Sequence, residues 1–272
     1  MRPGDITPLL ITFNEEANLH RTLAGLAWAR EIVVVDSGST DRTLEILQNR
    51  LGVRVLSRKF DTFATQCQFG VDSGLILTPW VLALDADYVV PSSFVDEVRE
   101  LTNKDAVSGY EVEFTYCVWG RPLRGSLYPP RNVLFRRGEG RFVDDGHGHF
   151  IALSGEGRRL RTKFFHDDRK SLTRWLVSQD SYMQVEVGKL NSAQQLSLAD
   201  RVRRTLVLGP IAAPCYALFM KGAILDGWPG WYYALQRMVA EAILSLRLLE
   251  RRWRAEYAVC KDDRADVVPK DL

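Results

Sequence analysis

Two carboxylates one residue apart, Asp85 and Asp87, are the strongest sign of chemistry in the sequence. They lie in the run VLALDADYVV, whose apolar residues, with Trp80 before it and Pro91 after it, predict an interior strand. Residues i and i+2 of a strand point to the same face, where two like charges would repel by roughly 2–3 kcal/mol at an effective dielectric near 20. A divalent cation would relieve this repulsion; the alternative is a pair of solvated carboxylates in a loop.

Polar residues also follow two apolar runs upstream, TPLLITF and EIVVVD, which both predict buried strands. Thr12, Asn14 and Glu15 lie at the end of the first, and Asp36 and Ser37 at the end of the second. Since ligands of parallel sheets bind beyond the carboxyl ends of the strands, we expect these side chains to meet the two central carboxylates at one edge. Neither G-x-G-x-x-G nor G-x-x-x-x-G-K-[ST] occurs, which disfavours dinucleotide and Walker-type phosphate binding. A carboxylate-rich cleft indicates instead a divalent cation that holds a phosphate.

The first hundred residues alternate between strand and helix patterns, which predicts the elements that position these groups. Apolar residues recur at helical spacing after each strand, and Asn14 can cap the first of these helices. Near-continuous apolar strands are typical of a mostly parallel sheet covered by helices on both faces, so the expected fold class is α/β. From Ala106 to Phe165 the pattern changes to strands separated by Gly and Pro.

Three segments, LLITFNEEANLHRTL, EIVVVDSGSTDRT and WVLALDAD, resemble in this order the opening motifs of family 2 glycosyltransferases, which have the GT-A (Rossmann-like) fold. A weaker resemblance continues through YPPRNVLFRR, HDDRKSLTRWLVSQDSY and LDGWPGWYYALQR, to members that build envelope polysaccharide and lipopolysaccharide core. The resemblance implies that Thr12, Glu15 and Asp36 line the base pocket of a nucleotide-sugar donor. Asn14 and Ser37, which adjoin them, are further candidates for donor binding.

The same resemblance implies a metal site. Asp85 and Asp87 would hold Mn²⁺ or Mg²⁺, with Asp87 preferred as the direct ligand, and the cation would bridge the donor diphosphate and stabilise charge on the leaving group. Many close relatives have Glu where Tyr88 stands here, which leaves the role of that Glu unassigned. His166 follows an apolar strand and could complete the metal shell. The competing interpretation is a cap of the next helix by Asp167, Asp168 or Ser171.

The segment RFVDDGHGHF holds four titratable groups within six residues, Asp144, Asp145, His147 and His149. An inverting transfer needs a base that takes the proton of the acceptor hydroxyl. Asp145 is the first choice because Gly146 lets the backbone turn, Asp144 is the second, and His147 could serve instead. A transition-metal site and a structural turn are the alternatives. Arg131, in PPRN, could clamp a diphosphate, or lie on a solvated strand face.

Composition limits the possible classes of protein. The 272 residues suffice for one large domain with an extension, and a net charge of +2 argues against nucleic acid as a partner. Four scattered cysteines form no metal-type pair and suit reduced thiols of a cytosolic protein. Because the N-terminus lacks a basic start followed by an apolar run, we expect no export signal.

We expect a catalytic domain over residues 1–170, with a nucleotide-sugar half at 1–101 and an acceptor half at 102–170, followed by a helical region at 171–272. The run TLVLGPIAAPCYALFM is too short to cross a bilayer. Between Trp231 and Arg254 the apolar residues predict an amphipathic helix, and residues 201–261 carry ten basic and four acidic side chains, a net of +6. This pattern suits peripheral binding to an anionic membrane at the inner face of the cell membrane; a helix packed on the catalytic domain or a dimer contact is the alternative.

The leading hypothesis is an inverting, metal-dependent glycosyltransferase of hexosyltransferase type. It would move a sugar from a nucleotide sugar, preferably a UDP-sugar, to a lipid-linked or membrane-proximal saccharide in envelope polysaccharide or lipopolysaccharide synthesis. A sugar-phosphate nucleotidyltransferase shares the sheet type, but ITFNEEANL lacks the Gly-rich, Arg-containing loop expected after its first strand. A non-catalytic carbohydrate-binding or scaffold protein at the membrane is a further alternative, which Asp85, Asp87 and the acidic loop disfavour.

Overall fold

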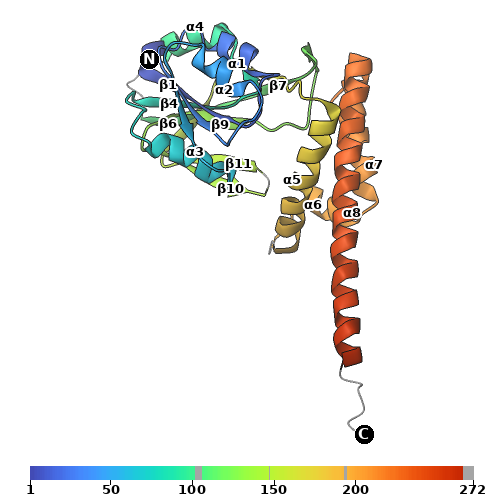
Figure 1. Ribbon diagram of the computed structural model, residues 1–272. Helices are drawn as coiled ribbons and strands as arrows, with labels where there is room; N and C mark the ends of the chain where they lie inside the picture. Colours follow the sequence, from blue (N-terminus) through green and yellow to red (C-terminus); the bar gives the residue numbers. More distant parts are fainter. Residues whose placement is uncertain (102–105, 147, 193–194, 266–272) are drawn as a thin grey trace. The chain divides into compact units, whose positions relative to one another are not determined.

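A computed structural model of the chain describes residues 1–101, 106–146, 148–192 and 195–265 (Figure 1). The chain forms two compact units, Met1–Ser171 and Leu172–Leu272.

The first unit is built on a seven-stranded sheet with the order β12-β6-β9-β4-β1-β2-β3. Its strands are β1 Ile6–Thr12, β2 Ile32–Asp36, β3 Val53–Ser57, β4 Trp80–Asp85, β6 Val107–Val112, β9 Arg131–Arg136 and β12 Glu156–Arg159. Strand β1 pairs in parallel with β2 and β4, β2 with β3, and β6 with β12. Only β9 runs antiparallel to its two neighbours, β4 and β6. The expected α/β class with a mostly parallel sheet is therefore confirmed.

Helices cover both faces of this sheet because its central strands are apolar on both sides (Figure 1). On β2, Ile32 and Val34 pack into one core with α1 Leu19–Gly25, α2 Thr43–Gln48 and α4 Ser93–Glu100. Val33 and Val35 pack into the other core, with α3 Phe63–Asp72 and the hairpin of β10 Gly140–Asp145 and β11 Gly148–Leu153. A short 3₁₀ helix, Pro3–Asp5, precedes β1.

A second, four-stranded sheet lies beside the end of β4. Its order is β5-β13-β7-β8, with β5 Tyr88–Val89, β7 Phe114–Val118, β8 Arg121–Pro122 and β13 Phe164–His166. His166 on β13 lies opposite Tyr88 on β5 in an antiparallel pair. This pairing brings the segment after His166 to the turn that holds Asp87, whose carbonyl accepts a hydrogen bond from the Asp167 amide at 3.0 Å.

Two local expectations from the sequence are wrong. Strand β4 ends at Asp85, so Asp87 lies in the following turn and the two carboxylates do not share a strand face. Asn14 does not cap a helix: its φ of 54° is left-handed, and α1 begins only at Leu19, with Asn18 at its N-cap. A short asparagine side chain tolerates this backbone region better than most residues do.

The second unit is helical, with α5 Leu172–Ser192, α6 Leu198–Arg204, α7 Leu208–Cys215, a π-helical turn Tyr216–Met220, a 3₁₀ turn Ala223–Asp226 and α8 Trp228–Ala265. Its core joins α5 and α8 through Met183, Val187, Leu190, Leu244 and Leu248. Only part of the apolar stripe expected on α8 joins this core: Ile243 packs against it, and Val239 and Ala242 are half-buried. The other members of the stripe, Leu235, Met238, Leu246 and Leu249, are exposed. Within the described part of the chain, no helix is both long and apolar enough to cross a membrane.

Candidate active site

The carboxyl ends of β1, β2 and β4 bring most of the predicted site residues to one edge of the sheet. Thr12 is in register with Asp36 on the neighbouring strand, and Asp85 pairs with Ile11 on the other side of β1. The order of the strands, which the sequence does not show, places the end of β1 between the other two.

The first group at this edge is a loop organised by the Asp36 carboxylate, which is buried. It accepts hydrogen bonds from the Thr12 hydroxyl at 2.8 Å, the Ser39 hydroxyl at 2.5 Å, and the amides of Gly38 and Ser39 at 2.9 and 2.8 Å. The amide of Asn14 donates to the Ser39 hydroxyl at 2.7 Å. Thr12, Asn14 and Asp36 are thus brought together as predicted for one pocket, but all four lone-pair directions of the carboxylate are already used within the loop.

Ser37 lies on the α3 side of this loop. Its hydroxyl accepts a hydrogen bond from the Gln66 side chain at 2.9 Å, and its amide donates to the Thr12 carbonyl at 2.9 Å. Both contacts fix the loop after β2 against its neighbours.

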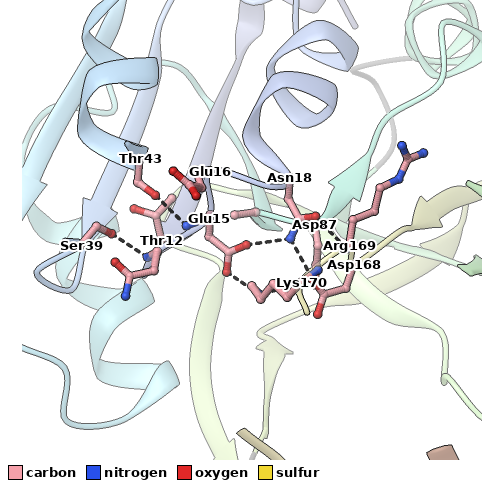
Figure 2. A network of polar contacts seen from close by, with 12 residues as sticks. Thr12, Glu15, Glu16, Asn18, Ser39, Thr43, Asp87, Asp168, Arg169 and Lys170 are labelled. Atoms are coloured by element: carbon pink, nitrogen blue, oxygen red, sulfur yellow. Dashed lines mark hydrogen bonds and ion pairs between the residues drawn. The ribbon is translucent and has the colours of Figure 1, made fainter. Parts of the chain in front are cut away.

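Glu15 points away from Thr12, toward Lys170 in the segment after β13 (Figure 2). One carboxylate oxygen lies 2.7 Å from the Lys170 ammonium, and the other accepts a hydrogen bond from the Asn18 side chain at 2.9 Å. The same Asn18 amide donates to Asp168 at 2.9 Å, and the Lys170 ammonium lies 3.6 Å from that carboxylate. Glu15 therefore faces the segment after β13, and its role in donor binding stays a prediction.

Burial and neighbouring charges shift the pKa values of Glu15 and Lys170 in this network. Burial raises the pKa of Glu15 to about 7, against the opposing effect of the Lys170 ammonium and with a further rise from the charge on Asp87. The pKa of Lys170 is raised in turn, because the carboxylates of Glu15, Asp87 and Asp168 outweigh the effect of its own burial. Lys170 is therefore a largely buried cation at this edge of the sheet. Sequence reasoning missed it, although it lies four residues after His166 in HDDRK.

Asp87 and His166 form the second group. Asp87 Oδ2 lies 3.2 Å from His166 Nε2. Among the described residues, neither Asp87 Oδ1 nor His166 Nδ1 has a hydrogen-bond partner, although both atoms are buried. A buried carboxylate oxygen without a partner is costly, so Asp87 together with His166 would fit a divalent cation. Across the described ranges no set of three or more His, Cys, Asp or Glu side chains could hold a metal by itself.

The ring of His166 is enclosed by three tyrosines. The ring centroids of Tyr88, Tyr116 and Tyr128 lie 5.5, 4.8 and 4.4 Å from that of the imidazole. The hydroxyls of Tyr88 and Tyr128 share a hydrogen bond. Packing of this kind fixes the orientation of the imidazole toward Asp87.

Asp85 belongs to a third group that faces a small cavity of about 20 Å³, which Tyr88, Arg131, His149 and Cys67 also line. Burial alone would raise the pKa of Asp85, but His149, Arg131 and a hydrogen bond from Tyr88 outweigh it and lower the pKa. The cavity is large enough for one water molecule and too small for a substrate.

Arg131, predicted to clamp a diphosphate, lies in this third group. Its guanidinium stacks over the Tyr128 ring at 5.2 Å from the centroid and donates to the His149 carbonyl at 3.3 Å. The structure therefore places its charge beside Asp85, largely inside the protein.

The predicted base residues lie on the β10–β11 hairpin. Asp144 accepts a hydrogen bond from the Ala64 amide at 3.0 Å, at the first turn of α3, so its carboxylate has a structural partner. Asp145 is exposed at the end of β10, and Gly146 after it has a φ of 62°, as a tight turn requires. His147 lies outside the described residues, while His149 faces the interior, with its Nε2 3.9 Å from the Cys67 sulfur.

At the edge of the sheet as a whole, carboxylates outnumber cations. The charges of Glu15, Asp87 and Asp168 act on the Lys170 ammonium, and that of Asp85 acts on Arg131. Arg21 also interacts with Asp87 and Asp168. An excess of carboxylates over cations is an environment that a divalent cation would fit.

A family model described as "Glycosyl transferase family 2" matches residues 9–160. The lipopolysaccharide core biosynthesis glycosyltransferase LpsC of Rhizobium meliloti (strain 1021) is 32% identical over 265 residues, which cover 90% of this chain and 92% of LpsC. An uncharacterized glycosyltransferase of Rickettsia bellii (strain RML369-C) is 30% identical over 135 residues, which cover 48% of this chain and 45% of that protein.

Among solved structures, S. aureus TarS 1–349 in complex with UDP-GlcNAc aligns with a TM-score of 0.47 and 13% identity, over 94% of this chain and 92% of that one. The family model spans more than half of the chain, and LpsC matches it over nearly its whole length. The chain belongs to glycosyl transferase family 2.

Proposed function

We propose that the protein is an inverting, metal-dependent hexosyltransferase. It moves a sugar from a nucleotide-sugar donor, preferably a UDP-sugar, to a lipid-linked or membrane-proximal saccharide of lipopolysaccharide core or a related envelope polysaccharide. Membership of family 2 supports the glycosyl transfer, and the similarity to LpsC supports the class of acceptor.

One observation carries the proposal: the buried Asp87 oxygen that has no partner among the described residues, next to His166. Asp87, with His166, would hold Mn²⁺ or Mg²⁺. A bound cation would supply positive charge to the diphosphate of the donor and to the leaving group. The chain's own residues fix the position of Asp87. Three tyrosine rings orient His166, and the Asp167 amide donates a hydrogen bond to the Asp87 carbonyl.

Other residues take the remaining roles in this proposal. Thr12, Asn14 and Ser37 shape the loop that would hold the nucleoside, with Asp36 as its organising anion. Asp145 accepts the proton of the acceptor hydroxyl, since it is exposed at the end of β10 while the Asp144 carboxylate holds the start of α3.

The metal role is tested by release of nucleoside diphosphate from a panel of nucleotide sugars. Asp87→Asn keeps the size of the side chain but removes its charge, and should abolish the Mn²⁺- or Mg²⁺-dependent release. Asp96→Asn, at an exposed position on α4 that pairs with Arg99, is the matched control and should behave like the wild type. Equal activity of Asp87→Asn and the wild type, or full activity in EDTA, would refute the metal role.

The base is tested in the same assay with acceptor present. Asp145→Asn should lower kcat at least about 100-fold with donor binding unchanged. If Asp145→Asn has normal kcat while Asp144→Asn or His147→Gln loses it with the fold intact, the base is that neighbour.

The place of action follows from the acceptor. We propose a cytoplasmic protein that binds peripherally to the inner face of the cell membrane, where a lipid-linked saccharide is available. The net charge of +6 over residues 201–261 supports attraction to anionic lipids.

A further inference from the structure

The second unit exposes an unusually apolar surface between α6 and the first turns of α8. Residues 207–235 include only two charged side chains, Lys221 and Asp226. They form α7, the π-helical turn, the 3₁₀ turn and the start of α8, and α7 packs along α8 (Figure 1). We call the outward side of this segment the apolar hairpin surface. Among its exposed members are Val207, Ile211, Phe219, Met220, Leu225 and Trp231, which are between 49% and 74% exposed.

Folding of the unit does not require these side chains. The inward side of the same segment is already apolar, with Ala217, Leu218, Ala223, Tyr233 and Ala234 buried. A helical hairpin that only packs on its own unit would carry polar residues on its outer side. An exposed apolar patch spread over four consecutive elements marks a surface that something else covers.

The residues around the apolar hairpin surface indicate that a lipid bilayer, rather than an acidic protein, covers it. Trp228 and Trp231, both about half exposed, are of the residue type enriched where hydrocarbon meets headgroups. Cationic side chains adjoin the patch: Arg201 and Arg204 are exposed before it, and Lys221 is exposed within it. Over residues 195–237 there are five basic and two acidic side chains, a net of +3, which complements anionic headgroups.

We propose that the apolar hairpin surface inserts into the headgroup and upper acyl region of an anionic bilayer, without crossing it. This inference rests on the proposed membrane-proximal acceptor and identifies the part of the chain that reaches the lipid. It differs from the expectation that the stripe of α8 binds the membrane, because Leu246 and Leu249 lie outside this surface. Apolar insertion also predicts that a part of the binding resists salt, unlike attraction by surface charge alone.

Sedimentation with vesicles tests the surface directly. The full chain should bind vesicles of phosphatidylcholine and phosphatidylglycerol, and retain part of this binding in high salt. The double variant Phe219→Ser, Met220→Ser should lower the partition coefficient for vesicles at least about 10-fold. Burial of one large apolar side chain alone raises such an equilibrium constant by about that factor. The matched control is Leu246→Ser, Leu249→Ser, at two exposed apolar positions of α8, and should bind like the wild type.

A native cysteine gives a second readout. Cys215 at the end of α7 is exposed, whereas Cys67 and Cys117 are buried. In a Cys260→Ser background, a fluorophore on Cys215 should shift its emission to the blue when these vesicles are added, and spin-labelled lipids should quench it.

Three results would overturn the inference: no binding to these vesicles at low salt, an equal loss in the Leu246/Leu249 control, or a dimer in analytical ultracentrifugation that Phe219→Ser abolishes. The last result would assign the surface to a second copy of the chain. Release of nucleoside diphosphate without lipid should be normal in the Phe219/Met220 variant. A failure of vesicle binding alongside normal release would therefore reject this inference and leave the proposed function standing.

Discussion

The buried ion pair of Glu15 and Lys170 should make the stability of the first unit depend on pH in a defined direction. The folded pKa of Glu15, about 7, lies above its unfolded value of 4.5, so the folded state binds this proton more tightly. The stabilising contribution is complete below pH 4.5 and is lost as the pH rises through about 7. A difference of about 2.5 units, at about 1.4 kcal/mol per unit, amounts to about 3 kcal/mol.

Glu15→Gln isolates this contribution because glutamine keeps the shape but does not titrate. Lys170 keeps its charge throughout this range, since its pKa is raised. The loss of its ion-pair partner therefore changes the free energy of unfolding of Glu15→Gln by an amount that does not depend on pH. The free energy of unfolding of the wild type minus that of Glu15→Gln should therefore fall by about 3 kcal/mol between pH 4.5 and pH 8.

Urea unfolding across this pH range, in EDTA to keep cations from Asp87, measures the difference. Glu16→Gln is the matched control, because Glu16 is the next residue and its side chain is 43% exposed beside Arg42. Water solvates that carboxylate, so the control should lack the change. A difference between wild type and Glu15→Gln that stays constant from pH 4.5 to pH 8 would refute the reasoning.

Three further substitutions test the packing around the site by urea unfolding. Tyr88→Phe removes the partner of the buried Tyr128 hydroxyl and the hydrogen bond to Asp85, and should cost about 1–3 kcal/mol; an unchanged stability would show that neither bond contributes. Asp144→Ala removes the acceptor at the start of α3 and should cost about 0.5–2 kcal/mol, whereas no loss would contradict its structural role. Gly70→Ala places a Cβ 2.5 and 2.9 Å from two core side chains and should cost about 1–3 kcal/mol. Its control is Gly188→Ala, on an exposed helical position, which should stabilise by about 0.5–1 kcal/mol, and equal effects at both glycines would reject the overpacking argument.

The sheet could be predicted from the sequence because its signal is local. Strand β2 is apolar at every position up to Asp36, so its burial on both faces follows from composition alone. The end of β4 could not be predicted to one residue. The apolar pattern continues through Ala86 and Tyr88, and only the pairing of Tyr88 with His166 on another strand shows that the chain turns between them. That contact joins positions 78 residues apart, and no local pattern carries it.

The candidate site also combines residues that local sequence predicts with residues whose contacts come from distant parts of the chain. Thr12 and Asp36 were predicted to lie together because both end parallel strands, and the register confirms their proximity. Lys170 was missed because a lone lysine after HDDR has no signature of its own. Its significance arises only where Glu15, from a loop more than 150 residues earlier, lies 2.7 Å from it. The contacts of Glu15 with Lys170 and Asn18 could not be predicted for the same reason, since the residue type does not reveal which of two neighbouring groups it faces.

The repulsion between the two central carboxylates, inferred from the sequence, is relieved largely by the protein itself. Asp85 faces Arg131 and accepts a hydrogen bond from Tyr88, and its lowered pKa keeps it charged inside the fold. Asp87 lies beyond the strand end and turns toward His166. Among the described residues its second oxygen has no partner. Arg131 and Tyr88 therefore compensate Asp85 inside the fold, whereas the second oxygen of Asp87 is the group that a bound cation would satisfy. On this argument the two aspartates are not equivalent. Neutralising Asp85 should unpair a buried guanidinium and weaken the fold, whereas neutralising Asp87 should remove a binding group and leave the fold intact.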